Sequence, residues 1–185
     1  MTSALLPAAA SHPPQEPALL SQYRHVRSAT EAMVADLSDA DATVQSMDDA
    51  SPAKWHLAHT TWFFEEFVLS ARLPDYEPVD PQYRYLFNSY YEAVGARHPR
   101  PRRGLLTRPS LDEVLAYREA VDEAMESLLM RAQTDDEAAL ITLGLHHEQQ
   151  HQELLLPDIL HLFAQNPLRP ASAPPLPSPV ISDPR

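Results

Sequence analysis

The chain has 185 residues, of which 44% are hydrophobic, and its formal net charge at pH 7 is −12. This length suits one hydrophobic core, and the acidic charge argues against a nucleic-acid partner or an anionic membrane surface, because phosphate binding depends on Lys and Arg. Cysteine is absent, which excludes disulfides and leaves His and carboxylate side chains as the strong metal ligands. No stretch has the apolar length of a membrane span, and residues 1–6 lack the positive start of a signal peptide, so we expect a cytoplasmic protein.

Prolines divide the chain into segments. Residues 1–17 contain four prolines and are expected to form a disordered N-terminal arm. Apolar side chains at helical spacing predict a first helix from residue 18 to about 37. Ser51 as N-cap and Pro52 in the first turn predict a second helix, which runs to Arg72 and ends before a group of three prolines.

Two further helices are predicted at about 110–132 and 135–164, each opened by a capping box. The capping pairs are Ser110 with Glu113 and Thr134 with Glu137. Residues 167–185 hold seven prolines and no periodicity, so they are expected to be a tail or an interdomain linker that follows one helical domain at 18–166. Four helices with a long connection between the second and the third predict an all-α protein, an antiparallel four-helix bundle.

The last predicted helix contains His147-Glu148-Gln149-Gln150-His151. Histidines four residues apart lie on one helix face, about 5–6 Å apart at Cβ, and can bind one metal ion. A third ligand is offered by the Trp55–His59 segment of the second helix, which contains His56 and His59. Histidines interrupt two apolar stripes here, and metal binding would satisfy groups that are costly to bury. The stripe on the last helix is Leu140, Leu143, Gly144, His147, His151, Leu154, Leu155 and Asp158.

The same segment spells HExxH, in which zinc peptidases use the two His as ligands and the Glu as general base. A metzincin would have Gly and His where this chain has Leu154 and Pro157. Other peptidases of this type need a Glu ligand further along the chain, and the last glutamate is Glu153. The sequence therefore disfavours a peptidase.

Four segments together resemble a known family: SPAKWHLAHTTWFFE at 51–65, YRYLFNSYYE at 83–92, RHPRPRRG at 97–104 and HHEQQHQEL at 146–154. Over about residues 20–170 the chain is similar to the N-terminal DinB-like domain of the ergothioneine-biosynthesis sulfoxide synthases, the EgtB family. The resemblance implies a DinB-like four-helix bundle that holds Fe(II). It also implies that O2 joins the thiol of γ-glutamylcysteine or cysteine to the imidazole of hercynine, giving a sulfoxide.

The resemblance assigns roles to individual residues. The implied iron ligands are His59, His147 and His151, and Gln150 matches the residue that contacts the hercynine imidazole. Guanidinium groups can pair with the carboxylates of γ-glutamylcysteine, and the candidates for that role are Arg97, Arg100, Arg102 and Arg103. His56 is expected beside the site or at the surface, and His146 is expected to point about 100° away from His147.

Glu148, Glu65 and Glu66 are expected either to orient the ligand imidazoles or to lie on solvated helix faces. EgtB-type enzymes continue into a second domain that resembles the formylglycine-generating enzyme and supplies part of the substrate pocket. The Pro-rich segment 167–185 stands where the linker to that domain would begin. Two alternatives stay open: a free-standing DinB-like metal-dependent thiol transferase, and a non-catalytic remnant that still binds metal.

Overall fold

The computed structural model describes residues 16–172, and in this range the protein is helical, without a β-strand. The elements are α1 (Ala18–Ala32), α2 (Asp39–Thr43), α3 (Ala53–Phe64), the π-helix η1 (Glu65–Leu69), α4 (Ser70–Arg72), α5 (Tyr83–Leu86), the 3-10 helices η2 (Glu92–Val94) and η3 (Arg100–Leu105), α6 (Leu111–Leu129) and α7 (Asp135–Ala164). The expectations for residues 1–15 and 173–185 lie outside the described residues.

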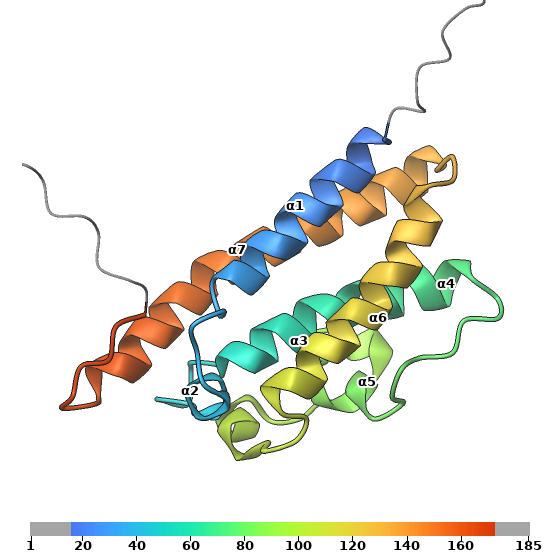
Figure 1. Ribbon diagram of the computed structural model, residues 1–185. Coiled ribbons are helices and arrows are strands. Elements are labelled where there is room, and N and C mark those ends of the chain that lie inside the picture. The colour runs from blue at the N-terminus through green and yellow to red at the C-terminus, as the bar shows by residue number, and fades with distance from the viewer. Residues whose placement is uncertain (1–15, 173–185) are drawn as a thin grey trace, which may run out of the picture.

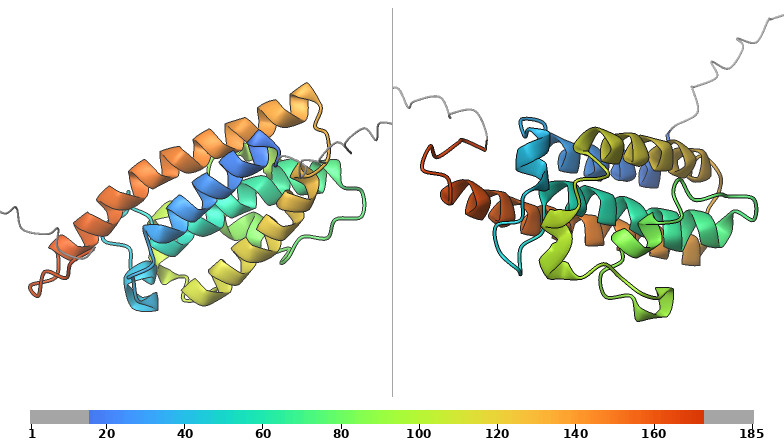
Figure 2. Two further views of the ribbon diagram at one scale, coloured as in Figure 1. Left: turned by 45° about the horizontal axis from the view of Figure 1, so that its top comes forward. Right: turned by 90° about the horizontal axis from the view of Figure 1, so that it is seen from below.

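Four long elements form the predicted bundle (Figure 1): α1, the continuous rod of α3, η1 and α4, then α6 and α7. The rod packs against both α6 and α7, and α1 packs against α7. The views in Figure 2 agree that α1 and α7 run in one direction while α3 and α6 run in the other. Because α3 and α6 are parallel, the chain must return along the bundle between them. This return accounts for the long connection at 73–110.

The capping boxes that open α6 and α7 are present as predicted. The second helix begins one residue later than expected, at Ala53. Its N-cap is Pro52 instead of Ser51, and no side chain accepts a hydrogen bond from the first N–H groups of the helix. The Ser51 hydroxyl instead accepts a hydrogen bond from Nη1 of Arg103 at 2.9 Å. The first helix ends at Ala32, before the predicted residue 37, and Ser38 caps a separate short helix, α2.

The buried face of α7 differs from the predicted stripe. Leu143 and Leu154 are 57% and 48% exposed, whereas Ile141, Leu145 and Glu148 are fully buried. The side of α7 that carries Glu148 and packs against α1 is therefore rotated from the face that carries the histidines. At Gly144 the helix approaches α3 so closely that an added Cβ would lie 2.6 Å from the Phe64 ring. None of the described helices combines the length and apolarity needed to cross a bilayer.

Candidate metal centre

Three histidines converge where α3 faces α7. The ring centroids of His59, His147 and His151 lie 4.7 to 4.9 Å from one another, and one ring nitrogen of each lies within 4.8 Å of the others. Nε2 of His59 is 3.1 Å from Nε2 of His147. The two predicted clusters, 88 residues apart in sequence, therefore form one site.

The spacing of the His59 and His147 nitrogens fits two ligands of one divalent ion. Metal–imidazole bonds are about 2.1 Å long, so two bound nitrogens lie about 3.0 Å apart at a right angle and about 3.4 Å apart at a tetrahedral angle. The observed 3.1 Å lies in that interval. A metal between these nitrogens would also satisfy ring nitrogens that otherwise face one another in a largely buried space.

His59 is held by its surroundings in an orientation suited to a ligand. Its Nδ1 lies 2.6 Å from the carbonyl oxygen of Phe87, so Nδ1 carries the proton and Nε2 keeps its lone pair for a metal. The ring is stacked between two indoles, Trp55 at 4.7 Å and Trp62 at 5.5 Å. Segment 83–91 thus fixes the His59 ring through a backbone carbonyl, which sequence patterns do not reveal.

His151 has its own support from His56 and Asp158. Nδ1 of His56 lies 2.9 Å from Nδ1 of His151, and Nε2 of His56 lies 3.0 Å from an Asp158 carboxylate oxygen. His56 was expected either beside the site or at the surface, and at 3% exposure it lies beside the site. An Asp–His pair behind a ligand imidazole fixes its ring orientation, which leaves Nε2 of His151 for the metal.

All of these imidazoles are held in the neutral form that binds metals. Burial lowers the pKa of His147 to about 4. Burial, followed by the neighbouring imidazoles, also lowers the pKa values of His59 and His151. Nδ1 of His147 is buried without a hydrogen-bond partner in the described structure, while His146 is exposed, as its predicted direction requires.

The three histidines line one side of a cavity of about 270 Å³. Gln150 lines it too, one residue before His151. Of the candidate arginines, Arg100 and Arg103 reach this cavity, whereas Arg97 is exposed and lies 3.9 Å from Glu92. Segment 89–91 also contributes to the lining, a feature that the sequence analysis missed.

Comparison with known proteins assigns the chain to a family. The model of the DinB superfamily matches residues 22–155, which cover most of the four bundle elements and include His59, His147 and His151. The chain belongs to the DinB superfamily. The DinB superfamily is metal-binding, and the histidine triad supplies residues for such a site. No curated protein matches the chain.

Glu148 does not serve the metal centre of this DinB domain, contrary to the expectation that it orients a ligand. It is fully buried on a neighbouring face of α7, about 100° around the helix from His147, where it accepts hydrogen bonds from Arg27 at 2.9 Å, from Thr30 at 2.6 Å and from Arg118. Burial alone would raise its pKa, but the two arginines outweigh burial and lower the pKa to about 2. A carboxylate so acidic and so enclosed cannot act as the general base of a peptidase.

Glu66 also does not orient a ligand imidazole, contrary to expectation. Its carboxylate accepts a hydrogen bond from Nε of Arg84 at 3.1 Å near the surface, not from a ligand imidazole. Glu65 is buried, contrary to a solvated face, and accepts hydrogen bonds from Tyr76, Tyr117 and the backbone of Val79. Both glutamates belong to η1, where the wider π-helical turn changes their direction.

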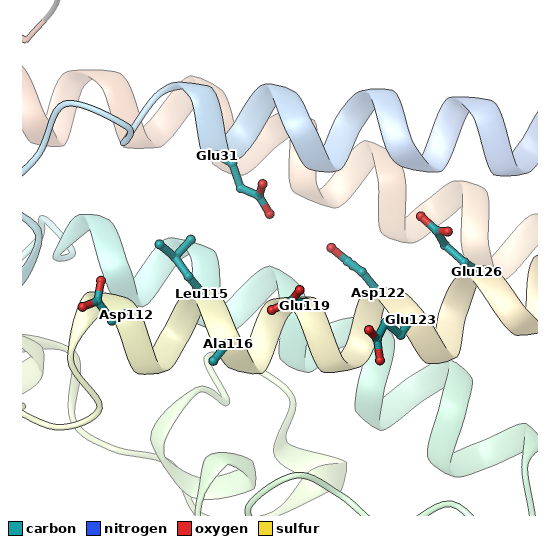
Figure 3. Close-up of a pocket in the computed structure, with 8 residues that line it drawn as sticks. All are labelled: Glu31, Asp112, Leu115, Ala116, Glu119, Asp122, Glu123 and Glu126. Atoms are coloured by element: carbon teal, nitrogen blue, oxygen red, sulfur yellow. The ribbon is translucent and has the colours of Figure 1, made fainter.

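A larger groove of the DinB domain, of about 630 Å³, lies between α1 and α6, away from the histidines (Figure 3). Its lining is mostly acidic: Glu31, Asp112, Glu119, Asp122, Glu123 and Glu126, with Leu115 and Ala116. Some of these carboxylates already pair with basic side chains, such as Asp122 with Arg27 and Glu126 with Arg24. The larger volume therefore does not mark the candidate metal centre, which is distinguished by the convergence of neutral imidazoles.

Proposed function

We propose that this domain is the iron-binding part of an O2-dependent sulfoxide synthase. It would join a cysteine-derived thiol, that of γ-glutamylcysteine or cysteine, to the imidazole of hercynine. The observation that carries the proposal is a three-histidine site opening into a cavity that is also lined by an amide and two guanidinium groups. A second domain, on the same chain or on another, would close this cavity.

Three histidines on one side of an ion leave positions open for substrates, in the manner of non-haem iron oxygenases. A structural zinc site would instead be closed by a fourth protein ligand. The candidate cluster has three members, and the nearby Asp158 carboxylate is already bound to His56 and to the backbone of Ser51. The donor set therefore supports a catalytic rather than a structural metal.

The remaining lining supports the proposed substrates. Gln150 presents an amide that can both donate to and accept from an imidazole, next to the ligand His151. Arg100 and Arg103 can pair with the carboxylates of γ-glutamylcysteine or cysteine. Arg103 is held for this task because its guanidinium lies over the Trp55 ring at 3.3 Å and donates to Ser51.

The overall reaction balances with one O2. The imidazole loses a C–H hydrogen and the thiol loses its S–H hydrogen, one C–S bond and one S=O bond form, and the second oxygen atom leaves as water. Bound Fe(II) would supply the activation of O2 and the site for the thiolate. The protein would orient the imidazole through Gln150, neutralise the carboxylates through Arg100 and Arg103, and exclude water with segment 89–91.

The test is anaerobic reconstitution with Fe(II), followed by O2-dependent turnover with hercynine and either γ-glutamylcysteine or cysteine. We expect sulfoxide when a formylglycine-generating-enzyme-like domain is supplied, and slow thiol oxidation without C–S bond formation by residues 1–185 alone. Gln150→Ala should raise KM for hercynine, whereas Gln149→Ala, the matched exposed control, should not. Metal-dependent thiol transfer by the chain without O2 would favour a DinB-like transferase and contradict the proposal.

A further inference from the structure

Both tryptophans of the chain stack on the same candidate ligand, His59. The Trp55 ring lies 4.7 Å from the imidazole and nearly parallel to it, and the Trp62 ring lies 5.5 Å from it at an angle of 20°. Indole and phenol are the aromatic side chains that give up one electron most readily. Two such rings against one ligand therefore bear on the fate of oxidants formed at a redox metal.

The surroundings of Trp55 disfavour its oxidation. The guanidinium of Arg103 lies 3.3 Å from the Trp55 ring centre, and the indole N–H donates to the carbonyl oxygen of Leu86 at 3.2 Å. Removal of an electron from Trp55 would place a positive ring beside a buried positive charge. Such repulsion is strong where water is excluded.

Trp62 has uncharged aromatic neighbours instead. Its ring lies 5.6 Å from the ring of Phe67 and 5.6 Å from that of Tyr91. Trp62 is 1% exposed, and its indole N–H is buried without a hydrogen-bond partner among the described residues. An oxidised indole becomes a neutral radical by giving this proton to an acceptor. Without an acceptor the positive charge is not trapped on Trp62 and passes to a neighbour, which gives the orphaned N–H a redox role.

Tyr91 is the oxidisable neighbour. It is half-buried and lines the metal cavity of about 270 Å³, which is wide enough for water that takes up the phenol proton. Burial raises the pKa of Tyr91, so the resting group is the protonated phenol. The fully buried Asn88 fixes its backbone, since Asn88 accepts from the N–H of Tyr91 and donates to its carbonyl oxygen, both at 3.2 Å.

We propose that Trp62 and Tyr91 form an electron relay that protects the metal centre when O2 is reduced without substrate. The oxidant is peroxide, the two-electron reduction product of O2, whose conversion to two water molecules takes two electrons and two protons. Bound Fe(II) supplies one electron and becomes Fe(III). Tyr91 supplies the other through Trp62 and becomes a phenoxyl radical, and the two protons come from its phenol and from solvent. The ligand imidazoles are thereby spared from oxidation.

The relay is a function beyond sulfoxide formation and requires only iron at the three histidines. The test therefore uses the full chain loaded with Fe(II), its iron content measured, and hydrogen peroxide without substrate, followed by rapid freezing and EPR spectroscopy. We expect a phenoxyl signal that narrows when tyrosine is ring-deuterated and is lost in Tyr91→Phe and in Trp62→Phe. The signal should persist in two matched controls, Tyr90→Phe beside Tyr91 and Trp55→Phe on the other side of His59.

Mass spectrometry after peroxide treatment gives an independent measurement. In Tyr91→Phe the relay ends at Trp62, so Trp62 should gain oxygen while Trp55 does not. This comparison removes one hydroxyl only and decides the matter even if Trp62→Phe fails to fold. Iron-loaded protein without a phenoxyl signal, or a signal of equal size in all four variants, refutes the relay whatever the sulfoxide assay shows. A chain that retains no iron refutes it as well, and the measured iron content separates that result from a failure of the relay itself.

Discussion

Replacing Glu148 with Gln should destabilise the domain without emptying the metal centre. The carboxylate lies between α1 and α6 and is bound by Arg27, Thr30 and Arg118. Glutamine keeps one carbonyl oxygen but presents an amide, a donor, to guanidinium groups that are themselves donors. The buried guanidinium groups of Arg27 and Arg118 would then lose the negative charge of Glu148.

The magnitude follows from the burial of all three charged groups. Arg27 is 3% exposed, and Arg118 and Glu148 are fully buried. Removing one partner of a buried ion pair costs about 3–5 kcal/mol, because the remaining charge stays desolvated. Arg27 keeps Asp122 at 2.7 Å and Arg118 keeps Glu31 at 2.9 Å, which favours the lower half of that range. For a domain of this size we expect Tm to fall by about 6–15 °C.

The assay is thermal and denaturant unfolding followed by circular dichroism, with metal content measured on the folded protein. Glu153→Gln is the matched control, because Glu153 is exposed on the same helix and should change stability by less than about 0.5 kcal/mol. The reasoning is refuted if Glu148→Gln leaves Tm unchanged. Loss of a metal-dependent hydrolysis at full stability would instead place Glu148 at the metal, as in a peptidase.

Further predictions concern the metal centre. Alanine at any of the three candidate ligands, His59, His147 or His151, should remove metal, measured by elemental analysis after Fe(II) or Co(II) loading, whereas His146→Ala should retain it. His56→Ala should weaken metal binding about tenfold, since His56 contacts the His151 ring from behind. Gly144→Ala should cost about 1–3 kcal/mol and weaken metal binding, because the new methyl pushes α7 from α3; unchanged metal affinity would contradict this. The metal-free domain should lose stability as pH falls from about 6.5 to about 4, because the lowered pKa of His147 lets the unfolded chain bind the proton first; a flat Tm over this interval would disprove it.

The bundle could be predicted because its signals are local. Capping boxes fix where α6 and α7 begin, and helical periodicity predicts where the long helices lie, although α1 ends at Ala32 and not at residue 37. The convergence of His59 with His147 could also be inferred, since both interrupt apolar faces of predicted helices. The sequence did not predict which face of α7 is buried. Leu143 and Leu154 are as apolar as Leu145, and only the packing of α7 against α1 and α3 determines which of them is buried.

The supporting groups of the site were harder to foresee. The partner of His59 is the backbone carbonyl of Phe87, and every residue has such a carbonyl. Glu66 adjoins the aromatic residues of α3, but η1 turns it toward Arg84 at the surface. His56 was recognisable as a neighbour, yet its role depends on Asp158, 102 residues further along the chain. Contacts of this range depend on tertiary structure that periodicity does not specify.

The HExxH spelling illustrates why spacing alone cannot assign a role. Two histidines at i and i+4 share a helix face, so the pattern predicts two neighbouring imidazoles that could bind one metal ion. The glutamate between them stands about 100° around the helix from His147, where it could turn toward the metal or toward the core. Here the choice is made by Arg27 and Arg118, which lie 121 and 30 residues away in sequence and require a carboxylate inside the bundle. The same five letters therefore position a general base in a peptidase and the centre of a buried ionic network in this domain.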